Sequence, residues 1–161
     1  MCPERGVLGE RSSCRLNAPG RRLGCTSPED LRIRARRLVE EVLNQGDLAV
    51  ANELMSPTCI HHVPGSVLAP GPASLRDWLS RTLRIFPDFH AIVEDEFAAG
   101  DRVALRFTAY GRHAATGRPV EFGVLQIVRT GADGRFTEHW CSADLLTVVA
   151  QLSAPALRRV I

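Results

Sequence analysis

The chain has 161 residues, 45% hydrophobic and 24% charged, which is the composition of an ordinary globular protein with enough apolar side chains for a core. Its net charge is only +2, and the Arg residues are spread along the whole sequence, so nucleic-acid binding is not indicated. No apolar run approaches the roughly 18 residues of a membrane-spanning helix, and residues 1–25 lack the apolar centre of a signal peptide, so we expect a cytoplasmic protein. The five Cys residues include no CxxC pair, which argues against a disulfide framework.

Residues 1–27 differ in composition from the rest of the chain. They mix Arg, Gly, Pro, Ser and Cys without a hydrophobic period, and such a segment buries too little apolar surface to offset the entropy lost on ordering. We therefore expect a disordered arm over residues 1–27 and one folded domain over residues 28–161. Ser27 followed by Pro28 is a typical helix start, with Ser at the cap and Pro at the first helical position.

Apolar residues at helical spacing predict three helices in the first half of the domain, over residues 31–43, 47–55 and 74–86. A short extended segment over residues 59–64 and a Gly/Pro-rich loop over residues 65–72 separate the second helix from the third.

The hydrophobic period changes to two after Pro87, which predicts β-strands. Turn residues divide this half into strands over residues 89–97, 102–110, 120–129 and 135–142, and a final helix follows over residues 143–152. The sequence therefore predicts an α+β domain, with three helices packed on a curved, mainly antiparallel sheet that encloses a cone-shaped cavity.

The stretch Glu138 to Leu146, EHWCSADLL, places Asp144 between a predicted strand and an apolar helix. Two interpretations are open. As a helix N-cap, the carboxylate accepts hydrogen bonds from the first free helical N–H groups. As an acid at the floor of a pocket, its pKa is raised by apolar neighbours, which suits proton transfer near neutral pH.

Three segments, FPDFHAIVEDEFAAGDRVALRFTAYG, TGRPVEFGVLQIVR and DGRFTEHWCSADLLTVVAQL, together with LNQGDLAVANELMSPTCIHHVP, resemble the SnoaL-like polyketide cyclases of the NTF2-like superfamily. The resemblance covers nearly all of residues 30–153. The resemblance implies an NTF2-like α+β cone and a homodimer packed through its sheets. It also implies ring closure of a small polyketide-like molecule by intramolecular aldol condensation, without cofactor or metal. Such reactions belong to secondary metabolism, for example antibiotic biosynthesis. In that family an Asp is the acid/base, and Asp144 matches its position.

The sequence also departs from the family. The hairpin over residues 111–115 is shorter than in many relatives, which affects the expected substrate size. Epoxide hydrolases of the wider group carry an Arg-x-Asp on a strand, whereas this chain has Arg106-x-Thr108, which disfavours epoxide opening. An epoxide hydrolase, a hydroxylation accessory and a non-catalytic small-molecule-binding dimer remain alternatives.

Strand alternation groups the candidate site residues by face. We expect Arg106, Thr108 and Tyr110 to line the cavity, because their face of the strand is more polar than the opposite one. The opposite face, with Val103, Leu105, Phe107 and Ala109, is then expected to form the interface between subunits. Likewise we place Trp140 on the cavity side with Asp144, and His139 on the other side.

The expected roles follow from this placement. Asp144, Arg106 and His62 are the predicted catalytic residues, with Asp144 removing a proton next to a carbonyl and Gln126, His62 or Arg106 holding the enolate. The predicted substrate-binding residues are Gln126, Trp140, Tyr110, Thr108, Phe122, Met55 and Trp78. Structural alternatives stay open: Arg106 as an ion-pair partner, Gln126 as a hydrogen-bonding residue of the sheet, and His62 as a surface residue. His61 and His62 point to opposite faces of a strand, so we expect no metal site from the pair.

Overall fold

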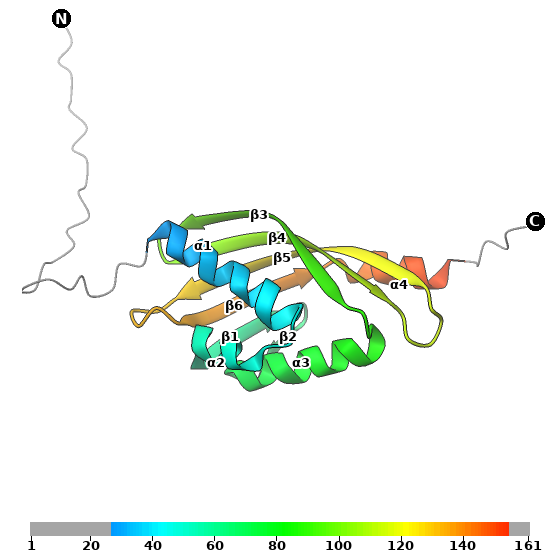
Figure 1. Ribbon diagram of the computed structural model, residues 1–161, viewed down its shortest axis with the longest axis horizontal. Helices are drawn as coiled ribbons and strands as arrows, with labels where there is room; N and C mark the ends of the chain where they lie inside the picture. Colours follow the sequence, from blue (N-terminus) through cyan, green and yellow to red (C-terminus); the bar gives the residue numbers. More distant parts are fainter. Residues whose placement is uncertain (1–26, 155–161) are drawn as a thin grey trace, which may run out of the picture.

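The computed structural model describes residues 27–154, in which helices cover one face of a curved six-stranded sheet (Figure 1). The arm predicted over residues 1–27 lies, apart from Ser27, outside the described residues, as does the end of the predicted domain, residues 155–161. The elements are α1 Pro28–Arg37, the π-helix η1 Leu38–Leu43, α2 Leu48–Leu54, β1 Met55–Val63, β2 Ser66–Leu68, α3 Pro72–Ile85, β3 His90–Ala99, β4 Arg102–Arg112, β5 Pro119–Thr130, β6 Phe136–Ala143 and α4 Leu145–Ser153.

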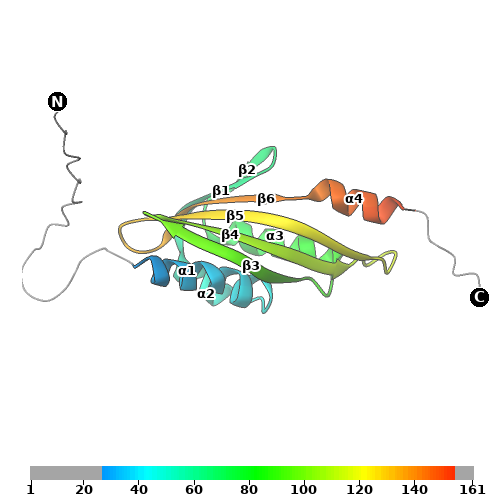
Figure 2. The ribbon, with the colours of Figure 1, turned by 90° about the horizontal axis from the view of Figure 1, so that it is seen from above.

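The strand order in the sheet is β2-β1-β6-β5-β4-β3, and β1 pairs with β6 in parallel while every other neighbouring pair is antiparallel. The predicted α+β class, with helices on a mainly antiparallel sheet, is confirmed. Figure 2 shows α1 and α2 on one side of the sheet and α4 continuing from the end of β6. No element within residues 27–154 covers the far side of the sheet.

The first helix begins as its capping residues indicate. The Ser27 hydroxyl accepts a hydrogen bond from the backbone N–H of Asp30, whose carboxylate in turn accepts from the backbone N–H of Ser27. The helix then changes to a π-helical turn over Leu38–Leu43, closed by a bond from the N–H of Asn44 to the carbonyl of Val39. Asn44 also exchanges two hydrogen bonds with the backbone of Ala91, which ties this end of the helix to β3.

The region between the second and third helices differs from the prediction. We expected the second helix to reach residue 55 and a loop to cover residues 65–72, but β1 begins at Met55 and residues 66–68 form the short strand β2. The strand accommodates Pro57 because the register of β1 on β6 shifts between Met55 and Ile60, so the missing N–H removes no ladder bond there.

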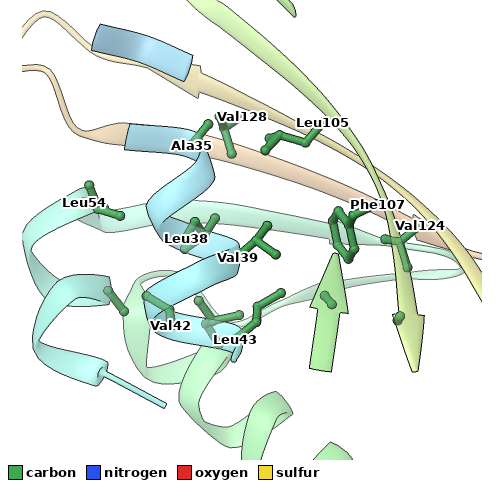
Figure 3. Packing of buried hydrophobic residues seen from close by; sticks show 14 of the residues in the cluster. Ala35, Leu38, Val39, Val42, Leu43, Leu54, Leu105, Phe107, Val124 and Val128 are labelled. Carbon is green, nitrogen blue, oxygen red and sulfur yellow. The ribbon is translucent and has the colours of Figure 1, made fainter. Parts of the chain in front are cut away.

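The core lies between the helices and the sheet. In Figure 3, Val39 and Leu43 of η1 point towards Phe107 and Val124 of the strands, and all four side chains are buried. The inward face of β4 carries its buried apolar residues, Val103, Leu105, Phe107 and Ala109. The prediction that this face forms the subunit interface is therefore wrong: it packs against the helices, because burying these side chains releases the most water from apolar surface.

We predict that Gly71→Ala destabilises the fold more than Gly46→Ala. Both glycines have positive φ, +87° and +72°, but a Cβ at Gly71 would lie 2.4 Å from the carbonyl oxygen of Pro57, whereas a Cβ at Gly46 meets nothing within 4 Å. Gly46→Ala should lower the free energy of unfolding by roughly 1–2 kcal/mol, and Gly71→Ala by about 1–3 kcal/mol more because of the clash. Chemical denaturation measures both, and equal losses would contradict the prediction.

Candidate active site

A cavity of about 340 Å³ lies between the sheet and α3. Its wall is almost entirely apolar and includes Trp78, Phe86, Phe89, Phe107 and Phe122. Exposed lining residues, among them Ile85 and Leu145, mark its mouth. The described residues that line it are Leu38, Leu43, His61, Val63, Pro64, Leu68, Leu75, Trp78, Thr82, Ile85, Phe86, Phe89, Phe107, Phe122, Val124, Gln126, His139, Cys141, Ala143 and Leu145.

The polar side chains of the cavity gather on three adjacent strands. His61 of β1 pairs with His139 of β6, and Gln126 of β5 pairs with Cys141, two residues further along β6. Because alternate residues share a face of a strand, His61, His139, Cys141 and Gln126 all point to the helix-covered side. His61, Gln126 and His139 are exposed by only 1%, 2% and 6%, so they form the buried floor of the cavity.

A chain of hydrogen bonds holds the two histidines. Nε2 of His61 lies 3.0 Å from the backbone oxygen of Gly71, and Nδ1 of His61 lies 3.1 Å from Nδ1 of His139. Burial lowers the pKa of His61, and burial together with the neighbouring His61 and His62 lowers the pKa of His139 to about 3. Both rings are therefore neutral at pH 7, and each carries one N–H and one lone pair.

Two buried atoms of this floor have no hydrogen-bond partner among the described residues: Nε2 of His139 and Nε2 of Gln126. Leaving a buried polar group unsatisfied costs roughly 1–3 kcal/mol. His139 and Gln126 occupy diagonal positions on neighbouring strands, close enough for long side chains to reach one region of the cavity. A bound molecule with a matching polar group can satisfy both atoms, which makes this floor the candidate active site.

Cys141 lines the cavity beside His139, but its chemistry is limited by burial, which raises the pKa of its thiol to about 11. The thiol therefore stays protonated at neutral pH and is a weak nucleophile. Among the described residues that line the cavity, none is Arg, Asp or Glu. Residues 27–154 hold no group of three or more His, Cys, Asp or Glu side chains suited to a metal ion, and none of their helices is long and apolar enough to span a membrane.

Asp144 lies outside the cavity lining, at the N-terminus of α4, where it is exposed. Its carboxylate accepts hydrogen bonds from the backbone N–H and the hydroxyl of Thr147, and these bonds lower its pKa. The expectation of a desolvated carboxyl with a raised pKa is therefore wrong, and the capping interpretation describes its contacts. Its neighbours Ala143 and Leu145 do line the cavity, so Asp144 sits beside the mouth.

Arg106, Thr108 and Tyr110 lie on the outer face of β4, not in the cavity as predicted. Arg106 is exposed and forms an ion pair with Glu94, which also accepts a hydrogen bond from Thr108. Tyr110 stacks on His90, with ring centroids 5.1 Å apart. The ion-pair alternative for Arg106 holds, although its partner is Glu94 and not Asp144.

His62 and Trp140 also lie on the outer face, where their rings stack 5.0 Å apart with planes 7° from parallel. Neither residue lines the cavity, and the predicted choice of His62 over His61 for the cavity side is wrong. Of the remaining predicted binding residues, Gln126, Phe122 and Trp78 line the cavity, whereas Met55 is buried in the core and borders a second hollow next to Gly71. Their roles in binding stay predictions.

The sequence reasoning missed His61, His139 and Cys141. Alternation predicts that Trp140 and His139 point to opposite faces of the last strand, but the prediction that Trp140 faces the cavity is wrong, because His139 lines it. The apolar alternation of β4 carried the correct signal, since the face with Leu105 and Phe107 must turn inward.

The buried histidines predict a stability that falls in mild acid. The unfolded pKa of a histidine is about 6.5, whereas that of folded His139 is about 3, so the unfolded chain binds more protons between these values. Stability should be complete above about pH 6.5 and fall by about 1.4 kcal/mol per pH unit below it for one such group. Urea denaturation between pH 7 and 5 measures this slope, which His139→Gln should reduce; equal slopes in both proteins would show that His139 is not buried as a neutral ring.

Comparisons with known proteins agree with this fold. A family model described as SnoaL-like polyketide cyclase matches residues 33–152. The structure of IdmH from Streptomyces antibioticus, a candidate polyketide cyclase, is 34% identical with a TM-score of 0.68, covering 77% of this chain and 99% of that one. AclR from Streptomyces galilaeus, a candidate hydroxylase, is 25% identical with a TM-score of 0.69, covering 80% of this chain and 100% of that one.

An epoxide hydrolase of the LEH-like type from M. tuberculosis shares the fold at 17% identity, with a TM-score of 0.63, covering 78% of this chain and 90% of that one. No curated protein sequence matches the chain significantly. The family match spans residues 33–152, which include the helix-covered sheet and the residues that line the cavity. The chain therefore belongs to the SnoaL-like polyketide cyclase family.

Proposed function

We propose that this protein is a cofactor-independent cyclase that closes a ring in a small, uncharged, polyketide-like molecule of secondary metabolism, acting in the cytoplasm. The observation that carries the proposal is the buried floor of the cavity, where a neutral imidazole and an amide each have a nitrogen with no hydrogen-bond partner in residues 27–154. The family match and the similarity to IdmH support a cyclase over the other reactions found on this fold.

The floor can divide an aldol-type ring closure between two side chains. Nε2 of His139 accepts a proton from a carbon next to a carbonyl, while the amide N–H of Gln126 donates to the carbonyl oxygen and stabilises the enolate. The enolate carbon attacks a second carbonyl of the same molecule, and the imidazolium returns its proton to the new alkoxide. The transient negative charge raises the pKa of His139 while it exists, so the ring can hold a proton although it is neutral otherwise.

The chemistry of the wall supports an uncharged substrate. None of the lining residues within 27–154 is Arg, Asp or Glu, and a carboxylate or phosphate moved among them would lose its hydration without an ionic partner there. Aromatic side chains such as Trp78 and Phe122 offer flat apolar surface for a ring system. Epoxide opening that relies on an Arg-x-Asp pair is disfavoured, because Arg106 and Thr108 are on the outer face and are bonded to Glu94.

A catalytic role for Asp144 stays a prediction. Since the carboxylate lies beside the mouth, it reaches only a substrate that extends out of the cavity, and both of its oxygens already accept hydrogen bonds from Thr147. His139 is buried at the floor of the cavity, whereas Asp144 is exposed to solvent. Water competes with proton transfer at an exposed site. We therefore favour His139 as the base.

We predict that His139→Gln lowers turnover by about 10²–10⁴-fold, the usual effect of removing a general base, and that Gln126→Leu lowers it by about 10²–10³-fold, as for loss of one oxyanion donor. The reaction to follow is deuterium uptake at the α-carbon of ethyl benzoylacetate, an uncharged aryl β-keto ester, by NMR in D₂O. An analogue with a carboxylate on the ring should not react faster than the background.

Asp144→Asn is the matched control, because it keeps most of the cap while removing the charge. We expect its exchange rate to stay within a few-fold of the wild-type rate. A full rate for His139→Gln together with a loss for Asp144→Asn would assign the base to Asp144 and contradict the proposal.

We also propose that the protein is a homodimer packed through the outer face of the sheet. This face has no covering layer in the described chain, and it carries exposed apolar side chains, including Ile60, Ile92, Phe97 and Leu125, of which Phe97 and Leu125 are 63% and 50% exposed. Exposed apolar patches of this kind are typical of protein–protein interfaces.

The dimer proposal predicts that Leu125→Asp produces a monomer, since a charge at the centre of the interface would be buried without a partner. Leu146→Asp is the control, because Leu146 is 79% exposed on α4 and lies away from the sheet face. Sedimentation or light scattering gives the mass. A wild-type monomer, or a dimer that survives Leu125→Asp and is lost in Leu146→Asp, would contradict this interface.

A further inference from the structure

His139 can act as a base in the cavity only if its lone pair is on Nε2. The hydrogen bonds of the neighbouring His61 bear on which nitrogen of His139 carries the proton. Nε2 of His61 lies 3.0 Å from the backbone oxygen of Gly71. A carbonyl oxygen only accepts hydrogen bonds, so this nitrogen of His61 must carry the proton. A neutral His61 then has its lone pair on Nδ1.

The tautomer of His61 also determines the tautomer of His139. Nδ1 of His61 lies 3.1 Å from Nδ1 of His139, so the lone pair of His61 requires an N–H from His139. A neutral His139 with its proton on Nδ1 has its lone pair on Nε2. That is the nitrogen without a protein partner among the described residues.

We propose that His61 is a positioning residue, which fixes the tautomer of His139 through the backbone oxygen of Gly71 and so keeps a base available at Nε2. Its effect on catalysis rests on the proposed function, whereas its effect on the tautomer does not. Hydrogen bonds to the far nitrogen are a general means of fixing which nitrogen of an imidazole is free to react.

The backbone around Gly71 supports a fixed anchor. Its N–H donates to the oxygen of Cys59 at 2.8 Å, and its own oxygen also accepts from the Ser74 hydroxyl at 3.0 Å. The opposite arrangement would need a doubly protonated His61 donating to His139. Within the described part of the chain no carboxylate lines the cavity to stabilise that charge, and burial lowers the pKa of His61.

Two substitutions separate the two hydrogen bonds of His61. In His61→Asn, the amide oxygen lies near the former Nδ1 and can still accept the Nδ1–H of His139. In His61→Gln, the amide nitrogen lies near the former Nε2 and can still donate to Gly71, but no acceptor remains beside His139. Asn should therefore preserve the tautomer of His139, and Gln should not.

The test is ¹⁵N NMR of the histidine side chains in the full-length protein at pH 7, with His139 assigned by its loss in His139→Gln. We expect protonated Nδ1 and unprotonated Nε2 on His139 in the wild type and in His61→Asn, and proton density on Nε2 in His61→Gln. Deuterium exchange of ethyl benzoylacetate should fall at least tenfold in His61→Gln and less than threefold in His61→Asn.

A wild-type His139 with its proton on Nε2, or an unchanged tautomer in His61→Gln, overturns the positioning role. If the tautomer of His139 changes in His61→Gln but the deuterium exchange rate does not, His61 is still a positioning residue, but His139 is not the base. If His61→Gln does not fold, as judged by circular dichroism, the wild-type and His61→Asn spectra still decide the tautomer.

Discussion

The two hydrogen bonds of the His61 ring are the constraint on which the candidate site depends. They join the start of α3, through the oxygen of Gly71, to β1 and then to β6, through Nδ1 of His139. A glycine is required at the anchor, because the space for a Cβ is taken by the oxygen of Pro57. The entry to α3, the pairing of β1 with β6 and the orientation of one buried imidazole are therefore parts of one arrangement.

The candidate site combines an apolar wall with a few neutral polar groups. The outer face of the sheet holds ion pairs such as Arg106 with Glu94 and Arg129 with Glu138, while the described polar groups of the cavity lining are neutral and lie in apolar surroundings. Electrostatic interactions are stronger where water is excluded. A developing enolate beside Gln126 would thus be held by few but effective contacts, and the same surroundings keep His139 neutral until a negative charge forms next to it.

The sequence was sufficient for the order of the elements and for their class, because helical and strand periods are local properties and Ser27 and Asp47 cap the helices as their residue types indicate. It was not sufficient for the choice of cavity face. Alternation places Trp140 and His139 on opposite faces of one strand but cannot say which of them faces inward. That depends on which apolar side chains the helices cover. The strand β2 and the hydrogen bond from His61 to Gly71 depend on tertiary contacts and leave no local pattern.

The most direct test of the account is a crystal structure of the protein with an uncharged aryl β-dicarbonyl compound, such as 1-phenylbutane-1,3-dione, bound in the cavity. We expect one carbonyl oxygen to lie within hydrogen-bond distance of the Gln126 amide, and the carbon between the carbonyls, or the enol oxygen, to lie against Nε2 of His139. A ligand whose carbonyl groups contact Asp144 at the mouth, with the floor residues untouched, would contradict it.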